Sequence, residues 1–280
     1  MTTDEILVLG ATGKTGRRVV RLLREAGRTV RAASRSGEVT FDWDRPATWG
    51  AALDGVATVY LVPPEDPAPV AAFTQQATDA GVSRFVVLSG RGIEHMDAAF
   101  GAGMTASERA VRESGVGWTI IRPNNFNQNF DEDLWREPLR SGRLALPTDA
   151  VPEPFIDVDD VAEVAAALLT AEGGEHDGQI YELSGPHALT FDEAVAVMAR
   201  AAGRPIGYER LTPGEYAAEL RAAGAPSEVV DALNTMFAVL RAGRAAHPVD
   251  GVRRVLGRDA RSFDAYADRA AANGAWAREE

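Results

Sequence analysis

Residues 5–27 read EILVLGATGKTGRRVVRLLREAG, and this stretch decides the fold. An apolar run ends in a glycine-rich turn, and apolar residues at helical spacing follow until a closing glycine. The pattern predicts a strand, a tight turn and a helix. The same alternation continues along the chain, with further strands predicted at 28–35, 38–43, 57–64, 84–90 and 117–123 and helices at 47–55, 69–81 and 105–115. Strands separated by helices predict parallel βαβ units and an open, doubly wound α/β sheet.

The rhythm changes after residue 123, where a polar and aromatic loop, NNFNQNFDEDLWREP, follows the last of these strands. A helix is then predicted within 155–169, a strand at 178–185 and a helix at 190–203. Beyond residue 205 the chain is mostly helical, with amphipathic segments at 213–224 and 227–243. We expect this later part to pack over the carboxyl ends of the strands, where ligand sites of such sheets lie.

Composition limits the classes of function that are open to the chain. It has 280 residues, a formal net charge of -12, an isoelectric point near 4.9 and no cysteine. The acidic balance argues against a nucleic-acid surface, and the lack of cysteine removes disulfides and thiolate chemistry. No segment approaches the roughly 18 apolar residues of a membrane span. The prediction is a cytoplasmic monomer or homodimer that acts on a small molecule and binds neither membrane nor nucleic acid.

The glycine-rich turn has the spacing of a dinucleotide site. Gly10, Gly13 and Gly16 lie between the first strand and the first helix, where backbone N–H groups approach a pyrophosphate at a helix N-terminus. A phosphate-binding Walker loop would need glycine where Val8 stands. The other candidate cofactor contacts of this turn are Thr12, Lys14 and Thr15.

The end of the second strand favours NADP(H) over NAD(H). Ser34 and Arg35 stand where an acidic residue would otherwise bind the ribose hydroxyl, and a guanidinium suits a 2′-phosphate. The loops after the third and fourth strands meet the same sheet edge, so Asp42, Trp43, Val62 and Pro63 are further candidates for the cofactor walls. We therefore expect a Rossmann domain that binds NADP(H) at 1–155. Residues 156–280 are expected to form a smaller, mainly helical substrate lobe, packed on the first domain and partly interleaved with it.

The chain resembles an atypical short-chain dehydrogenase/reductase of the NmrA-like group. The segments that carry the resemblance are GATGKTG, VRAASR, FVVLSG, ASERAVRESGVGWTIIRPNNFNQNF and FIDVDDVAEVAAALL, which span most of residues 6–170, and the later LGRDARSFDAYADRAAANGAW. Within the group it looks most like triphenylmethane-reductase-like proteins and iminium reductases of the ergot-alkaloid type.

The resemblance implies that the usual acid is missing. Many members carry a Tyr and a Lys separated by three residues on the helix after the fifth strand, and these positions hold Phe100 and Met104 here. Reduction of a ketone profits from a positioned proton donor, whereas an acceptor that is already cationic becomes neutral when it takes hydride. We therefore expect an NADPH-dependent reductase of a cationic or conjugated acceptor, such as an iminium or imine.

Other residues are candidates for the reaction centre. Ser89 and His95 are possible substitutes for the missing proton donor, and Ser89 is also a candidate for binding the cofactor. By resemblance, Pro123 flanks the nicotinamide. The residues expected to line the substrate pocket are His95, Phe100, Met104, Asn125, Phe126, Asn129, Phe130 and Trp135.

The sequence leaves two alternative functions open and supports two further structural expectations. A redox sensor that binds NADP(H) without catalysis and acts through a protein partner would also lack the Tyr and Lys. Quinone or enone reduction is a second alternative. The four histidines are too scattered to predict a metal site. The carboxylates of the segment DVDD at 157–160 are expected to cap a helix.

Overall fold

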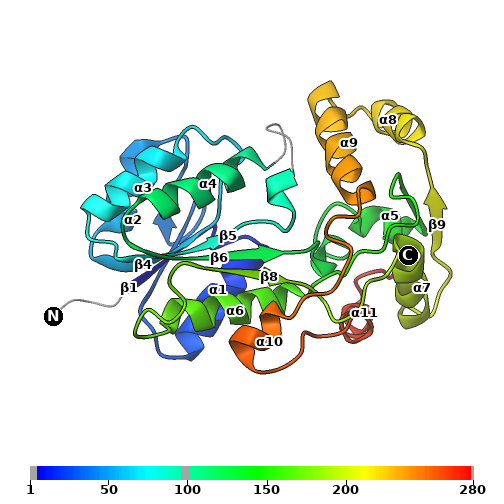
Figure 1. Cartoon of the computed structure of the whole chain (residues 1–280). Helices are drawn as coiled ribbons and strands as arrows, with labels where there is room; N and C mark the ends of the chain where they lie inside the picture. The colour runs from blue at the N-terminus through cyan, green and yellow to red at the C-terminus, as the bar shows by residue number, and fades with distance from the viewer. Residues whose placement is uncertain (1–4, 96–100, 279–280) are drawn as a thin grey trace.

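The computed structural model describes residues 5–95 and 101–278, and its centre is a seven-stranded sheet. The strand order is β3-β2-β1-β4-β5-β6-β8, and all neighbouring strands are parallel (Figure 1). The strands are β1 (Glu5–Leu9), β2 (Val30–Ser34), β3 (Val39–Thr40), β4 (Val56–Leu61), β5 (Arg84–Leu88), β6 (Gly117–Pro123) and β8 (Gln179–Leu183). The predicted doubly wound sheet is confirmed, and its order reverses between β1 and β4, beside the glycine-rich turn.

Helices cover both faces of this sheet (Figure 1). One face carries α1 (Lys14–Glu25), α6 (Val158–Thr170) and α10 (Gly251–Leu256), and the other carries α2 (Trp49–Leu53), α3 (Val70–Asp79) and α4 (Ala102–Glu113). Side chains alternate along a strand, so Ile6 and Val8 pack with the first group while Leu7 and Leu9 pack with the second. Burial on both faces explains the continuous apolar run of β1.

The third strand is shorter than the six residues expected at 38–43. The ladder to β2 ends when Thr40 has paired with Ser34, because Phe41 turns into the core and Asp42 starts a turn. The Asp42 carboxylate accepts a hydrogen bond from the backbone N–H of Asp44, and its carbonyl accepts one from the indole of Trp49. These bonds hold the turn in place of a longer edge strand.

A second, smaller lobe contains the rest of the chain. It has a two-stranded parallel sheet, β7 (Arg143–Leu146) and β9 (Gly207–Arg210), which the sequence pattern did not predict. Its helices are α5 (Arg136–Ser141), α7 (Phe191–Ala201), α8 (Pro213–Ala222), α9 (Ser227–Arg241) and α11 (Phe263–Ala272). Helices α8 and α9 lie inside the two amphipathic segments that were expected there.

Phe130 and Trp135 belong to the core of this lobe, which corrects their expected place in the substrate pocket. Both are buried, and the Phe130 ring packs against Phe155 and Phe263. Burying two large aromatic rings stabilises the lobe more than a half-exposed position on a pocket wall would.

The two lobes exchange segments along the chain. The sequence predicts a single boundary at residue 155. However, α6 and β8 come after this residue and belong to the large domain. In the opposite sense, α5 and β7 come before it and belong to the smaller lobe. The domains therefore interleave, and the polypeptide crosses between them several times.

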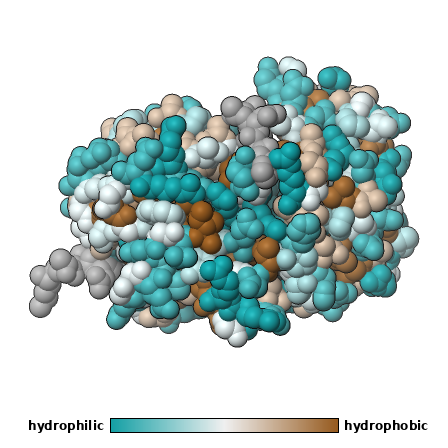
Figure 2. Space-filling model, in the orientation of Figure 1, coloured by the Kyte–Doolittle hydropathy of each residue, from teal (hydrophilic) through white to brown (hydrophobic). Residues whose placement is uncertain are grey.

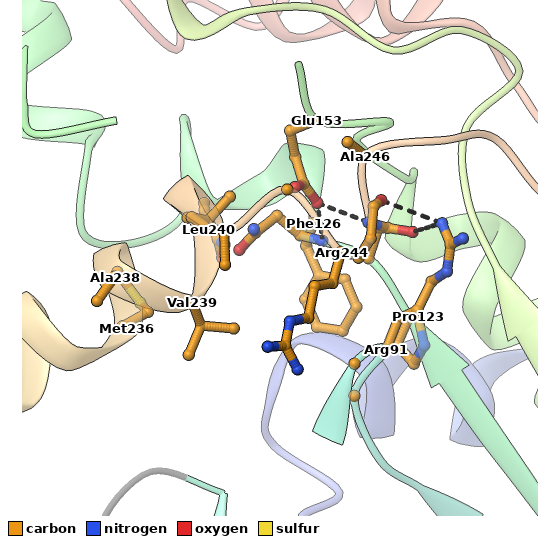
Figure 3. Close-up of a pocket in the computed structure, with 18 of the residues that line it drawn as sticks. Arg91, Pro123, Phe126, Glu153, Met236, Ala238, Val239, Leu240, Arg244 and Ala246 are labelled. Carbon is orange, nitrogen blue, oxygen red and sulfur yellow. Dashed lines mark hydrogen bonds between the residues drawn. The ribbon is translucent and has the colours of Figure 1, made fainter. Parts of the chain in front are cut away.

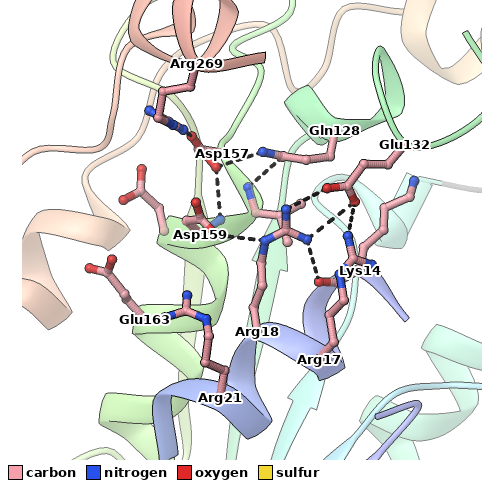
Figure 4. Close-up of polar contacts among 12 residues, drawn as sticks. Lys14, Arg17, Arg18, Arg21, Gln128, Glu132, Asp157, Asp159, Glu163 and Arg269 are labelled. Carbon is pink, nitrogen blue, oxygen red and sulfur yellow. Dashed lines mark hydrogen bonds and ion pairs between the residues drawn. The ribbon is translucent and has the colours of Figure 1, made fainter. Parts of the chain in front are cut away.

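Ion pairs join the loop after β6 to helices of the large domain (Figure 4). Arg18 on α1 donates to Glu132 and to Asp159, at 2.7 Å in both cases. Asp157 is the N-cap of α6, as expected for this acidic segment, and it accepts from the backbone N–H of Asp159. Asp157 also pairs with Arg269 of α11. The arrangement fixes the loop against α1 at the end that carries the glycine-rich turn.

Asp131 in this loop is expected to make stability depend on pH. Burial raises its pKa from 3.8 to about 6, and the nearby Glu132 adds to the shift, while the hydrogen bond from Tyr266 opposes it. The unfolded chain loses this proton at lower pH than the folded chain, so the contribution of Asp131 to stability falls as pH rises from about 4 to about 6. Asp131→Asn should therefore raise Tm at pH 7.5 by about 2 °C. This corresponds to about 1 kcal/mol in the free energy of unfolding, a value reduced because the group is partly exposed to solvent.

The same substitution should raise Tm by a much smaller amount near pH 4.5, because most of the stability of the protonated folded chain is lost only between that pH and about 6. Asp268→Asn, on the exposed side of α11, removes an equal charge and serves as the control. Thermal unfolding at both pH values measures the difference. Equal Tm gains for Asp131→Asn at pH 4.5 and 7.5 would contradict the assignment.

The visible surface is mostly hydrophilic, with apolar residues in scattered patches (Figure 2). Within the described residues, no helix has the length and apolar character needed to cross a membrane. The same residues contain no group of three or more His, Cys, Asp or Glu side chains that could hold a metal ion.

Candidate functional site

The glycine-rich turn brings β1 against the first turn of α1. Gly10 has φ of +62°, a conformation that side chains rarely adopt, and a Cβ on Gly16 would lie 2.1 Å from the Gly10 carbonyl oxygen. No side chain of the described residues caps the N-terminus of α1, whose N-cap is Gly13, and no acidic residue lies in its first turn. A helix end of this kind presents N–H groups and positive partial charge to an anion. The turn therefore fits the pyrophosphate of a dinucleotide.

The second strand ends beside this turn. The hydroxyl of Thr12 lies 3.3 Å from that of Ser34, the last residue of β2. Arg35, the next residue, is exposed and has no ion pair or hydrogen bond with any described residue. A solvent-exposed guanidinium next to a dinucleotide turn is available to a phosphate group.

The other predicted cofactor contacts lie around the same edge. Val62 follows β4 and stands against Gly10, where an added Cβ would lie 3.4 Å from the Val62 Cβ. Thr15 is buried at the start of α1, and Pro63 is partly buried. Trp43 packs edge-on against Phe73 with ring centroids 4.9 Å apart, so part of its ring belongs to the core of the large domain.

A cavity of about 570 Å³ lies between the two lobes, beyond the carboxyl ends of β5 and β6 (Figure 3). Lys14 lines the cavity on the side of the glycine-rich turn. The opposite side is covered by residues 235–246, which comprise the end of α9 and the segment after it. Seven of the expected substrate or cofactor residues line the cavity: Lys14, Ser89, Met104, Pro123, Asn125, Phe126 and Asn129. Phe100 and the side chain of His95 lie outside the described part of the structure.

Ser89 lines the cavity, but its hydroxyl hydrogen is already used. It donates to Glu108 Oε1 at 2.7 Å, and Glu108 also accepts from Arg122 at 2.7 Å. Burial raises the pKa of Glu108, but the bonds from Arg122 and Ser89 outweigh it and hold that pKa below its usual value. Because Glu108 is a carboxylate, Ser89 is oriented to accept a hydrogen bond from a ligand in the cavity and not to donate one.

Glu153 is a cavity residue that the sequence did not identify. The residue is 4% exposed, and its carboxyl accepts hydrogen bonds from the Asn124 side chain at 2.8 Å and the Asn125 backbone at 3.2 Å, both on Oε1. Asn124 in turn accepts from Arg91 at 3.0 Å (Figure 3). Burial raises the pKa of Glu153, although its hydrogen-bond donors oppose the shift. Only an acid between two prolines marks this position in the sequence.

Lys14 is held by the loop after β6. Its ammonium group donates to Asn129 and to Asp133, at 2.6 Å in both cases. Two predicted site residues, one assigned to the cofactor and one to the substrate, are therefore in direct contact. The loop that lines the cavity is tied to the turn that fits the pyrophosphate.

Comparison with known proteins agrees with this geometry. Residues 10–172 match a family model described as NAD(P)H-binding. The chain is 35% identical to the NAD(P)H azoreductase of Xenophilus azovorans, over 94% of this chain and 96% of that protein. It is 37% identical to the (4-alkanoyl-5-oxo-2,5-dihydrofuran-3-yl)methyl phosphate reductase of Streptomyces griseus, over 92% and 95%.

A solved structure shares the whole fold. The triphenylmethane reductase of Citrobacter, in complex with NADP(H), superposes with a TM-score of 0.76 at 20% identity, over 95% of this chain and 99% of that one. The match of the family model, the relatives of similar length and the shared fold bear out the resemblance of the sequence. The chain belongs to the NAD(P)H-binding, NmrA-like group of atypical short-chain dehydrogenases and reductases.

Proposed function

We propose that the protein is an NADPH-dependent reductase that delivers hydride to a cationic or conjugated acceptor, such as an iminium or imine, without a Tyr/Lys acid pair. The observation that carries the proposal is the cavity of about 570 Å³, which runs from Lys14 of the glycine-rich turn along the ends of β5 and β6. When bound, the cofactor supplies hydride from its nicotinamide ring. The residues of the chain bind the acceptor, orient it and exclude water from it.

The wall formed by β5 and α4 offers no transferable proton among its described side chains. Met104, where the resemblance places a lysine in other members, contributes a thioether to the cavity. The Ser89 hydroxyl donates its hydrogen to Glu108. An acceptor that needs a proton from this wall, as a simple ketone does, is therefore disfavoured, while a flat conjugated cation can pack on the polarizable sulfur of Met104.

The relatives support a conjugated acceptor. The names of the two curated relatives describe an azoreductase and a reductase whose substrate carries a lactone double bond conjugated with two carbonyl groups. In such substrates the charge that follows hydride transfer spreads over several atoms, so the proton need not come from the β5 and α4 wall. The apolar part of the wall, with Phe126 and residues of α9, suits a planar group of this kind.

Oxidation of NADPH by a panel of acceptors tests the proposal. We expect turnover with a cyclic iminium salt, a triarylmethane dye cation and an azo dye, and a rate at least about 100-fold lower with a simple ketone. The absorbance of NADPH at its nicotinamide band measures each rate. Phe100→Tyr/Met104→Lys, which restores the acid pair, should raise the ketone rate most. Tight NADPH binding without turnover of any acceptor would instead indicate a sensor.

A further inference from the structure

We propose that Glu153 is a catalytic acid that delivers a proton to neutral conjugated acceptors held in the cavity. The inference rests on the proposed reductase function and deepens it, because it extends the acceptors from cations to neutral double bonds. The β5 and α4 wall lacks a proton donor, whereas Glu153 approaches the same cavity from the segment between β7 and α6.

The position of Glu153 is held from several sides. Its backbone pairs with Leu189 in both directions, at 2.8 and 3.0 Å. Three residues further on, the backbone of Ile156 bonds to the chain on either side of Phe126, at 2.9 Å to the Asn125 carbonyl and 2.8 Å from the Asn127 N–H. The carboxyl is thus delivered to the cavity by a segment that has little freedom to move.

The hydrogen bonds of the carboxyl leave one oxygen for the proton. The Asn124 side chain and the Asn125 backbone N–H both donate to Oε1, and the Asn125 side chain also lies near the carboxyl. We therefore place the hydrogen of a protonated Glu153 on Oε2. No cation among the described residues lies within ion-pair distance of the carboxyl. The charge of Arg91 lowers the pKa of the Glu153 carboxyl, but the Arg91 guanidinium itself pairs with Glu182 at 3.0 Å and donates to Asn124.

Burial without an ion pair favours the neutral acid. Desolvation raises the pKa of Glu153, and the donors Asn124 and Asn125 and then the charge of Arg91 oppose that shift. The other charged groups that face the cavity are Lys14 of α1, which is paired with Asp133, and Arg244 after α9. A carboxyl that keeps its proton at higher pH than usual is suited to general acid catalysis.

The proposed step balances in atoms and electrons. The acceptor gains hydride at one end of its double bond, from the C–H bond that breaks in the reduced nicotinamide. The π electron pair moves to the other end, which takes the proton from Glu153 Oε2. Glu153 becomes a carboxylate and recovers a proton from water. The acceptor is reduced by two electrons and NADPH is oxidised to NADP+.

Glu153→Gln separates catalysis from support of the loop. Glutamine keeps an oxygen to accept from Asn124 and Asn125 but has no proton to deliver. We expect kcat with cyclohexenone or an azo dye to fall by about 100-fold or more, and kcat with a cyclic N-methyl iminium salt to stay within about threefold. The wild-type rate with the neutral acceptors should decrease as pH rises through the pKa of Glu153, and Glu153→Asp should retain part of it.

A measurement on the protein without cofactor provides an independent readout. Infrared difference spectra across a pH titration are recorded in an Asp131→Asn background, because the Asp131 carboxyl also keeps its proton to about pH 6. They should show the C=O band of a protonated carboxyl at a pH above the usual range of glutamate when Glu153 is present, and not when Glu153→Gln is added. Fluorescence titration with NADPH confirms that both variants fold and bind.

Three outcomes would overturn the proposal. Equal losses on neutral and cationic acceptors would make Glu153 a support for Asn124 and Asn125, and a loss on cations alone would make it their counter-ion. Unchanged rates with neutral acceptors would place the acid elsewhere. Failure of the wild type with every acceptor would instead count against the reductase function on which the inference rests.

Discussion

Gly16→Ala is expected to raise the Kd for NADPH by about 100-fold or more and to lower the stability of the fold by about 1–3 kcal/mol. The added Cβ would lie 2.1 Å from the Gly10 carbonyl oxygen and 2.9 Å from the Cα of Ala11. Both contacts are with backbone, so no side chain can rotate away to relieve them. Either the turn or the first turn of α1 must shift, and the N–H groups that face the pyrophosphate shift with it.

Gly50→Ala provides the matched control. Gly50 lies in α2, is exposed, and has the Gln76 side chain as its nearest neighbour, at 3.8 Å from the new Cβ. Alanine is a better helix former than glycine by about 1 kcal/mol, so this variant should be slightly more stable and should bind NADPH normally. Fluorescence titration and thermal unfolding measure both effects. Wild-type affinity in Gly16→Ala would exclude the turn as the pyrophosphate site.

The large domain could be predicted from the sequence because its signals are local. Apart from the two-residue edge strand β3, the strands of the sheet are short apolar runs bounded by turns, and β6 occupies the predicted range, 117–123. The predicted helices also have an apolar stripe that is complete within the helix itself. Helix α3, for instance, lies at 70–79 within the segment expected at 69–81. Periodicity read over ten or fifteen residues is sufficient for such elements.

The small sheet could not be predicted, because its pairing is not local. β7 and β9 have four residues each and lie about sixty residues apart in the chain, and β9 is mostly exposed. A strand so short and polar has almost no apolar pattern. The direction of the Phe130 ring is a similar case, since it depends on Phe155, Phe191 and Phe263, which reach it only in the folded lobe.

The candidate site also has a part that the local sequence predicts and a part that depends on residues distant in the chain. The glycine-rich turn was recognisable because its three glycines and the following helix are contiguous. Glu153 was not recognisable, because its burial depends on Asn124, which follows β6, and on the segment around Ala245. Lys14 was assigned to the cofactor from its place in the turn, but its partners Asn129 and Asp133 lie more than a hundred residues away.

Arg35→Asp is expected to lower the ratio of NADPH affinity to NADH affinity by about 100-fold or more. Arg35 follows β2, is exposed, and has no ion pair among the described residues, so its guanidinium is available to a 2′-phosphate. A bidentate bond between a guanidinium and a phosphate contributes about 1.5–3 kcal/mol, and a carboxylate at the same place adds repulsion. The carboxylate can also accept from the ribose hydroxyls of NADH, which raises affinity for the cofactor without the phosphate.

Arg221→Asp separates this local effect from the change in net charge. Arg221 is exposed on α8 of the small lobe, far along the chain from the turn, and its replacement alters the total charge by the same amount. Affinities for both cofactors, measured by fluorescence titration at two salt concentrations, should be nearly unchanged in this variant. In Arg35→Asp the loss of NADPH affinity should shrink as salt screens the phosphate. An unchanged affinity ratio in Arg35→Asp would show that other residues bind the 2′-phosphate. Any preference for NADPH would then have to come from other cationic side chains at the same edge of the sheet.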